Sequence, residues 1–256
     1  MKRLILAGFM GVLVLSTGCQ GFTTSCPTED EVREAIRGLI SGNYTVEDIS
    51  PLKEIKGLCQ VVVKARNQPI VFYIDPEAKY IMAGNLLEIE TKKNLTREVA
   101  REYMRVDKKI LEELEKRVNF TFGEGPKYIY YITDPDCPFC KRTEPILEEF
   151  AKKNKVQIKV ILFPLPIHPE AFAKSVGLIC DKKGFKELMS KEELKKLYKK
   201  YKDEKKQCDE GKKAVKDNLQ FLTHQMGVTG TPTLVGMNGK IISGVPREED
   251  LLELIN

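Results

Sequence analysis

The stretch that decides the fold is Lys127-Tyr128-Ile129-Tyr130-Tyr131-Ile132-Thr133-Asp134-Pro135-Asp136-Cys137-Pro138-Phe139-Cys140. Residues 127–133 are mostly aromatic or β-branched, which predicts a strand that stops at the Asp-Pro-Asp turn. Residues 144–153 are amphipathic and rich in helix-forming residues. The two cysteines therefore lie where a strand gives way to a helix.

This position makes the two thiols unequal. Cys137 would begin the helix, where unpaired N–H groups and the helix dipole favour a thiolate. Cys140 would lie one turn inside the helix and be more buried. We therefore predict that Cys137 attacks a substrate disulfide and that Cys140 resolves the mixed disulfide by displacing the substrate thiol. Pro138 has no N–H, which costs nothing at this position because an N–H in the first turn of a helix has no partner within the helix. Phe139 is either a packing or a substrate-facing side chain.

The elements after the cysteine pair complete one domain. A second strand is expected at residues 156–163, followed by a mainly helical segment. Two short strands at 233–236 and 240–243 flank an Asn-Gly turn, which is a strong hairpin signal. A helix closes the chain. The order of strand, helix, strand, inserted helices, hairpin and helix is typical of an α/β thioredoxin-like catalytic domain, which we expect over residues 119–256.

The N-terminal half predicts a smaller α+β dimerisation domain over residues 26–92. Thr28 and Glu31 form a capping box before a short amphipathic helix that ends at Gly42. Three runs rich in β-branched and aromatic residues follow, each bounded by turn residues. We expect these strands at residues 57–63, 69–74 and 79–90.

The segment between the two domains, residues 93–118, predicts a linker helix. Apolar residues recur three or four apart at Val99, Tyr103, Val106, Ile110 and Leu114. A continuous helix here would span on the order of 30 Å and hold the two domains apart. The alternative is that the helix packs on the second domain.

The first residues predict an export signal over residues 1–19. Lys2 and Arg3 precede an apolar run of about a dozen residues, shorter than the roughly 20 that a membrane-spanning helix needs. Small residues then lead to Cys19, which fits a lipoprotein cleavage site at which this cysteine carries the lipid. The alternative is ordinary signal cleavage nearby. Either form is exported, and only the first is attached to a membrane.

Cysteine usage indicates disulfides rather than metal. With Cys19 set aside, six of the seven cysteines remain, and an exported chain reaches an oxidising compartment. The simplest pairing joins neighbours in sequence: Cys26 with Cys59, Cys137 with Cys140, and Cys180 with Cys208. A structural zinc site usually has two Cys-x-x-Cys pairs, and a haem site needs a histidine where Lys141 stands. We therefore expect neither a metal nor a cofactor.

The charge balance does not indicate nucleic acid. The formal net charge is +5, but Lys2 and Arg3 belong to the signal and the other cations are interspersed with acids. Stretches rich in lysine and glutamate, such as residues 191–206, are typical of a solvated helix face. His168 and His224 are interpreted as structural rather than catalytic.

A loop near the C-terminus strengthens the interpretation of the cysteine pair. The sequence Gly227-Val228-Thr229-Gly230-Thr231-Pro232-Thr233 stands just before the hairpin. It resembles the cis-proline loop of the thioredoxin superfamily, which packs beside the two active-site cysteines. The resemblance implies that Pro232 forms a cis bond and that the backbone of Thr231 binds an extended substrate segment. The alternative is an ordinary Thr-Pro turn, since only about 5–6% of X-Pro bonds are cis.

The resemblance narrows to the DsbC/DsbG family of bacterial periplasmic disulfide interchange proteins. It is carried by residues 72–75 and 80–84, by Thr133-Asp134 with the cysteine pair, and by residues 227–232. Cys180 and Cys208 fall where DsbC has a structural disulfide. The family implies a homodimer joined through the N-terminal domains, a cleft that accepts misfolded or oxidised exported proteins, and reduction by a DsbD-type membrane electron donor.

Departures from the family pattern keep the function open. Pro138-Phe139 is closer to the Pro-Tyr of DsbG than to the Gly-Tyr of DsbC, and the role of DsbG leans toward protecting single cysteines from oxidation. Cys19 and the Cys26/Cys59 pair also fall outside the DsbC pattern. We expect a disulfide isomerase or reductase, with a DsbG-like reductase and a dimeric holdase chaperone as alternatives.

Overall fold

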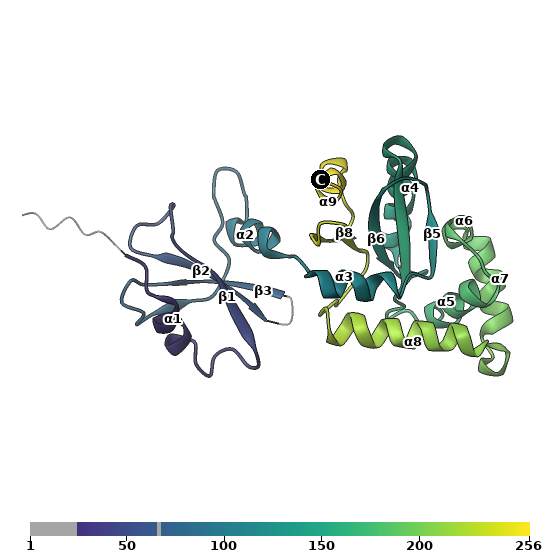
Figure 1. Cartoon of the computed structure of the whole chain (residues 1–256), viewed down its shortest axis with the longest axis horizontal. Coiled ribbons are helices and arrows are strands. Elements are labelled where there is room, and N and C mark those ends of the chain that lie inside the picture. The colour runs from purple at the N-terminus through teal and green to yellow at the C-terminus, as the bar shows by residue number, and fades with distance from the viewer. Residues whose placement is uncertain (1–24, 66–67) are drawn as a thin grey trace, which may run out of the picture.

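The structure is a computed structural model that describes residues 25–65 and 68–256. The expected export signal and the lipidation site Cys19 lie outside the described residues. Within the described ranges, no helix is both long enough and apolar enough to cross a membrane. The chain forms an N-terminal domain around strands β1 to β3 and a C-terminal domain around β5 to β8, which lie side by side (Figure 1).

The N-terminal domain packs one short helix on an antiparallel sheet. In the described residues its strands are β1 (Tyr44–Pro51), β2 (Cys59–Ala65), β3 (Gln68–Ile74) and β4 (Ile81–Met82), hydrogen-bonded in that order. Helix α1 (Glu29–Ala35) begins at the predicted capping box. Val32 on this helix and Ile36 just after it pack on the inward side chains of β2 and β3, which forms the core of this domain.

Two strands of this sheet differ from the prediction. Strand β1 was not expected, because it lies at the sheet edge and most of its side chains are only half-buried or exposed, which weakens its hydrophobic pattern. The strand expected over residues 79–90 is reduced to β4. After β4 the chain folds back on itself, since Glu88 N donates to Lys93 O at 2.8 Å and Leu95 N donates to Leu86 O at 2.9 Å.

The segment between the domains forms two helices instead of the single linker helix expected over residues 93–118. They are α2 (Leu95–Tyr103) and α3 (Lys108–Glu115). Between them the chain pairs with the second domain: Val106 N donates to Gly239 O, and Ile241 N donates to Met104 O, both at 2.8 Å. The Asp107 side chain then caps α3 by accepting from Ile110 N at 2.9 Å.

Each of these helices packs on one domain. Tyr73 of β3 and Thr96 of α2 share a buried hydroxyl hydrogen bond of 2.5 Å. Leu114 of α3 is fully buried in the core of the second domain, where Val106 also packs. The described chain therefore contains no continuous arm of about 30 Å. Packing on the second domain, the alternative considered for this segment, holds for α3.

The C-terminal domain is a mixed sheet with helices on both faces. In the described residues its strands are β5 (Phe120–Phe122), β7 (Val156–Leu162), β6 (Lys127–Thr133), β8 (Thr233–Gly236) and β9 (Ile241–Ser243), in that spatial order. Strands β6 and β7 are parallel and the other neighbours are antiparallel. The helices are α4 (Pro138–Asn154), α5 (Ala171–Cys180), α6 (Phe185–Met189), α7 (Lys191–Tyr201), the 3-10 turn η1 (Glu204–Lys206), α8 (Asp209–His224) and α9 (Glu248–Leu254).

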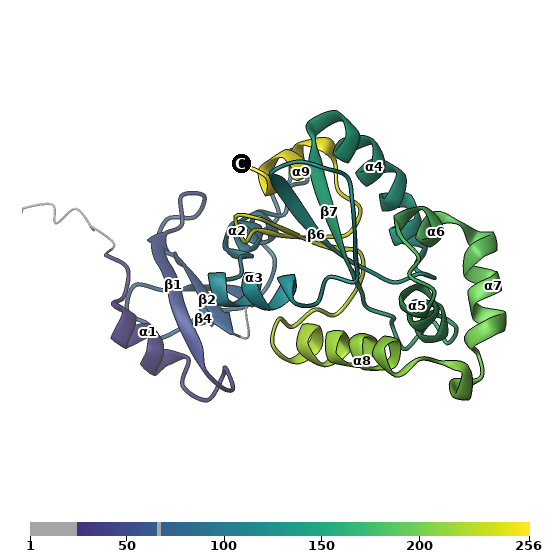
Figure 2. The ribbon, with the colours of Figure 1, turned by 45° about the vertical axis from the view of Figure 1, so that its right-hand side comes forward.

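Side chains of β6 alternate between two cores. Ile129 and Tyr131 pack on the face covered by α4 and α9, whereas Tyr130 and Ile132 pack on the face covered by α3 and α8. Helices α5, α6 and α7, inserted between β7 and β8, gather beyond the β5 side of the sheet (Figure 1), on the side away from the N-terminal domain (Figure 2). The cysteine pair lies at the start of α4, which follows the end of β6 after a short loop.

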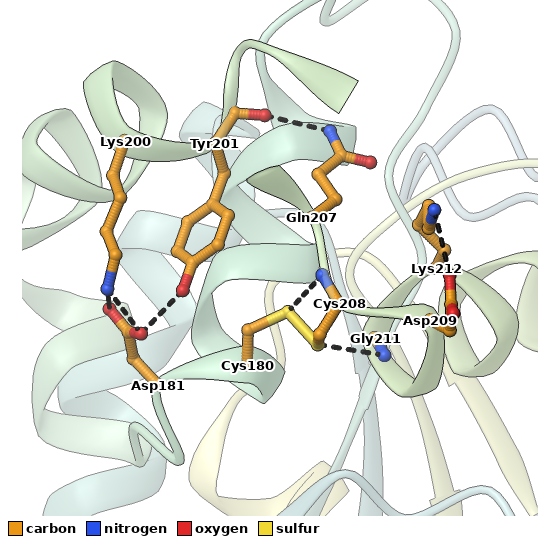
Figure 3. The surroundings of a disulfide bond; sticks show 9 residues. All are labelled: Cys180, Asp181, Lys200, Tyr201, Gln207, Cys208, Asp209, Gly211 and Lys212. Carbon is orange, nitrogen blue, oxygen red and sulfur yellow. Dashed lines mark hydrogen bonds and ion pairs between the residues drawn. A yellow bond between two sulfur atoms is a disulfide. The ribbon is translucent and has the colours of Figure 1, made fainter. Parts of the chain in front are cut away.

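A disulfide ties the inserted helices to α8. Cys180, the last residue of α5, is bonded to Cys208, which caps the start of α8 (Figure 3). Gly211 lies against this bond, because a Cβ there would come within 3.0 Å of Cys180 Sγ. In the N-terminal domain, Cys26 is bonded to Cys59. These bonds confirm two of the three expected neighbour pairings, whereas Cys137 and Cys140, the third expected pair, are free thiols in this structure.

We expect the double variant Cys180→Ser/Cys208→Ser to lose about 3–4 kcal/mol of unfolding free energy, because the bond joins residues with a sequence separation of 28. Serine at 208 can still accept the capping bond that Cys208 Sγ accepts from Gly211 N at 3.3 Å, so the loss reports the cross-link itself. Guanidinium unfolding of both proteins measures the difference. Loss of thiol exchange in a double variant that remains folded would contradict a structural role.

Candidate active site

The loop between β6 and α4 is organised by one buried carboxylate. Asp134 has no exposed surface. Its Oδ1 accepts from Asp136 N at 2.7 Å, and its Oδ2 accepts from Leu165 N at 2.7 Å. His168 Nδ1 lies 2.8 Å from the same Oδ2. These contacts join the loop to the segment that follows β7 and hold it in one shape.

Cys137 and Cys140 are both free thiols at the start of α4. Cys137 is the N-cap residue, and Pro138 occupies the first turn. Cys137 keeps 3% of its surface exposed, whereas Cys140 has none. Cys137 makes no side-chain capping bond, but it stands at the positive end of the helix dipole, which favours negative charge on the more accessible sulfur.

The cis-proline loop lies against the more accessible thiol. The Thr231-Pro232 peptide bond is cis, as the resemblance implied. Cys137 Sγ donates a hydrogen bond to Thr231 O at 3.4 Å. The pairing of β6 with β8 positions this contact, because Ile132 is the register partner of Thr233, which follows the cis bond. Residues far apart in sequence thus meet at one sulfur atom.

Burial makes the second thiol a much weaker acid. Desolvation raises the pKa of Cys140 to about 12, although the Asp134 backbone and the hydroxyls of Thr133 and Thr231 act in the opposite direction. The thiol at 140 therefore keeps its proton at neutral pH and needs a change in its surroundings before it reacts.

A buried glutamate on the same helix, α4, was not predicted from sequence. Glu144 lies one turn after Cys140 and is 1% exposed. Burial raises its pKa to about 7, although Lys141, with Nζ at 2.9 Å from Oε1, opposes the shift. Lys141 Nζ also donates to Leu188 O of α6 at 2.6 Å. No feature of the sequence distinguishes Glu144 from the solvated Glu148 four residues later.

The surface beside the thiols combines an aromatic ring and a cation. Phe139 is 52% exposed, and the Arg142 guanidinium lies 4.5 Å from its ring centroid.

His224 lies away from the cysteine pair, in the last turn of α8, where it lines a cavity of about 520 Å³ with residues of α3. Among the residues that the structure describes, no cluster of three or more His, Cys, Asp or Glu side chains is arranged to hold a metal ion.

A side chain of the N-terminal domain contacts the start of the cis-proline loop. Gln68 Nε2 at the start of β3 donates to Gly227 O at 3.3 Å and lies 3.4 Å from Met226 O. Gln68 and Met104 line, with residues 226–233, a cavity of about 190 Å³. Sequence patterns gave no sign of this contact, because it joins two domains through a single side chain.

Two cysteines at a helix start, with a cis-proline loop beside the first thiol and a sheet of this strand order, form the active site of thioredoxin-like thiol–disulfide oxidoreductases. Comparison with known proteins leads to the same class. Residues 114–256 match the Thioredoxin-like domain family, which covers more than half of the chain, and residues 23–97 match the Disulfide bond isomerase protein N-terminal domain.

Individual proteins are similar to this chain over more than half of its length. Thiol:disulfide interchange protein DsbG of Pseudomonas aeruginosa is 24% identical over 99% of this chain and 97% of its own length. A probable thiol:disulfide interchange protein DsbC of Bordetella pertussis is 23% identical over 88% of this chain and 75% of its own. A solved periplasmic thioredoxin-like protein from Salmonella enterica serovar Typhimurium is 22% identical, with a TM-score of 0.44, over 59% of this chain and 95% of its own. The chain belongs to the DsbC/DsbG family of thiol:disulfide interchange proteins.

We expect Cys137→Ser to abolish thiol exchange and Cys140→Ser to accumulate mixed disulfides with substrate, because only Cys137 has exposed surface and a helix N-terminus beside it. Non-reducing electrophoresis after incubation with an oxidised substrate separates the two outcomes. Trapping by the Cys137→Ser variant instead would reverse the assignment of the two thiols.

We expect Glu144→Gln to remove a fall in stability between about pH 4.5 and pH 7. The raised pKa means that the folded protein holds a proton which the unfolded chain has released in this range, so the free energy of unfolding decreases as pH rises, by about 3 kcal/mol in total. Urea unfolding across this range measures the slope. Glu148→Gln, on the same helix and 34% exposed, is the matched control and should leave the slope unchanged. An equal slope in the Glu144 variant would contradict the prediction.

Proposed function

We propose that this chain is an exported thiol:disulfide interchange enzyme that acts as a disulfide isomerase and reductase through Cys137 and Cys140. The observation that carries the proposal is the inequality of the two thiols. Cys137 caps α4 and contacts Thr231 O, whereas Cys140 is fully buried and its pKa is raised to about 12. Such a pair forms a mixed disulfide through the first sulfur and releases it through the second.

The chemistry begins when the Cys137 thiolate attacks one sulfur of a substrate disulfide. A bond forms between Cys137 and that sulfur, and the other substrate sulfur leaves as a thiolate. If a different substrate thiolate attacks the substrate sulfur of the mixed disulfide, a new substrate disulfide forms and Cys137 leaves as a thiolate, so the substrate is isomerised and the enzyme regains its dithiol. If Cys140 loses its proton and attacks Cys137, the substrate gains two electrons and the enzyme is left as a disulfide. The raised pKa of Cys140 slows this second route, which favours isomerisation.

The surroundings of Cys137 suit an unfolded protein chain. In the extended cis-proline loop, Thr231 offers backbone groups that can pair with an extended substrate segment. Phe139 is 52% exposed, and Ile167 is 76% exposed in the loop that Asp134 holds through Leu165. Apolar side chains of a misfolded or oxidised exported protein would find contacts on both sides of the thiol.

A free sheet edge in the N-terminal domain supports a homodimer. Strands β1 and β4 are the two edge strands of this sheet, and β4 is the shorter. The chain in and around it exposes large apolar side chains, namely Tyr80, Met82, Leu87 and Ile89. A small domain of this kind gains core by pairing with a copy of itself, and two strand edges can complete each other's hydrogen bonds. We place the dimer contact at this edge.

Location and electron supply complete the proposal. The export signal and the cysteine at position 19 indicate a periplasmic protein held at a membrane by a lipid, and two disulfides in the described chain suit an oxidising compartment. An isomerase must be kept as a dithiol there, so a membrane electron donor of the DsbD type would reduce Cys137 and Cys140. A DsbG-like reductase is favoured instead by Pro138-Phe139, and a holdase chaperone by the exposed apolar residues near β4.

We expect the reduced full-length protein to restore activity to scrambled ribonuclease A, whereas a truncation starting at Met104 keeps dithiol exchange but loses most of the isomerase rate. A start at Met104 retains Val106 and Leu114, which belong to the core of the second domain, and a start near Asn119 would remove them. Sedimentation should give a dimer for the full chain and a monomer for the truncation.

The serine variants separate the alternatives. If the chain is a holdase, the Cys137→Ser/Cys140→Ser double variant suppresses aggregation of an unfolded protein as well as the parent does, and scrambled ribonuclease is not rescued. If it is a DsbG-like reductase, it reduces a single oxidised cysteine while leaving scrambled ribonuclease inactive. Either result would contradict the isomerase proposal. Full isomerase activity in the truncation would instead contradict the dependence of that activity on the dimer.

A further inference from the structure

The loop that leads to Cys137 carries negative charge next to the reactive sulfur. Asp136 immediately precedes Cys137, and its side chain is 24% exposed. A carboxylate at this distance along the chain disfavours a neighbouring thiolate and acts against the helix N-terminus that favours it. A nucleophile at position 137 therefore needs this carboxylate to be neutralised.

A buried lysine from the inserted helices meets that carboxylate. Lys174 of α5 is 8% exposed, and it is the one buried lysine among the residues that the structure describes. Its Nζ lies 2.6 Å from Asp136 Oδ1 and 2.7 Å from Glu170 Oε2. The same nitrogen lies 5.6 Å from the centroid of the Tyr198 ring.

The lysine is charged in this environment. Burial lowers the pKa of Lys174, but hydrogen bonds and charge interactions with Asp136 and Glu170 outweigh burial and hold the pKa above its ordinary value. A cation removed from water is costly unless it is paired. Glu170, one turn earlier at the start of α5, could satisfy it alone. The second bond leaves the helix and reaches the loop before Cys137.

We propose that Lys174 is a positioning residue that holds and neutralises the Asp136 carboxylate, so that the Cys137 thiolate forms beside a balanced ion pair instead of an unpaired anion. This inference rests on the proposed role of Cys137 as the nucleophile. It also gives the helical insertion a part in the chemistry, because α5 supplies the cation to a loop of the thioredoxin-like sheet.

Other charged and titratable groups surround the same loop. His168 contacts Asp134, Glu170 shares Lys174, and α4 contributes the side chains that follow the cysteine pair. The charged and titratable groups on the packed elements include Tyr131, Asp134, Asp136, Cys140, Lys141, Arg142, Glu144, His168, Glu170, Lys174 and Tyr198. Of these, Lys174 is the cation bonded to the residue next to Cys137.

The test measures the alkylation of Cys137 by iodoacetamide against pH in a Cys140→Ser background, in the otherwise complete chain. We expect Lys174→Met to slow alkylation at neutral pH by about threefold to tenfold and to move the rate profile to higher pH, because Asp136 is then unpaired. Asp136→Asn should be no slower than the background. The double variant Lys174→Met/Asp136→Asn should regain most of the lost rate, since the carboxylate that needs neutralising is gone.

Lys159→Met is the matched control, because Lys159 is 13% exposed and pairs with Glu115 at 2.7 Å on the α3 side of the sheet. It should leave the alkylation profile unchanged. If Lys174 only supports the fold, Asp136→Asn slows alkylation as much as Lys174→Met and the double variant regains nothing, which would overturn the proposal. Where Lys174→Met does not fold, Asp136→Asn alone decides, since a rate below the background contradicts neutralisation. Isomerase activity plays no part in this measurement, so its outcome is separate from that of the ribonuclease assay.

Discussion

The buried carboxylate of Asp134 is the constraint on which the rest of the site depends. A carboxylate with no exposed surface must find its partners inside the protein, and Asp134 finds them in Asp136 N, Leu165 N and His168. These partners stop β6 at Thr133 and turn the chain into α4. They also attach the segment after β7 to the same point. Without them, the strand end, the helix start and the neighbouring loop would each be free to move.

Two further effects then distinguish two chemically identical thiols. The helix N-terminus acts on Cys137, while loss of solvent acts on Cys140 and raises its pKa to about 12. Only a small difference in depth separates them, since Cys137 is 3% exposed and Cys140 is not exposed. Two intervening residues place Cys140 about one helical turn after Cys137, so the two thiols differ in burial although they belong to the same short motif. The same helix carries Glu144 on its buried side, so that both an acid and a thiol there respond to the exclusion of water.

Local patterns allowed much of this site to be predicted from sequence. The β-branched run before Cys137, the position of Pro232 before a hairpin, and the even number of cysteines each contain their own signal, and the cis bond and the two structural disulfides agree with them. Contacts between distant segments could not be predicted. The linker pattern over residues 96–118 is helical throughout, yet Val106 pairs with Gly239 and the helix divides there. Likewise, nothing in the local sequence of Lys174 marks it as a partner of Asp136.

The Cys26–Cys59 bond has a mechanical consequence. Cys59 starts β2, which is flanked by β1 and β3 and hydrogen-bonded to both. A pulling force applied to the chain before Cys26 passes through the sulfur atoms directly into this inner strand, and α1 and β1 carry no load. Moving β2 lengthwise requires the ladders on both of its sides to shear at the same time. A force on the N-terminus therefore acts on β2, the strand that two hydrogen-bonded neighbours hold in place. Reduction of the Cys26–Cys59 bond would transfer this force to the short helix α1.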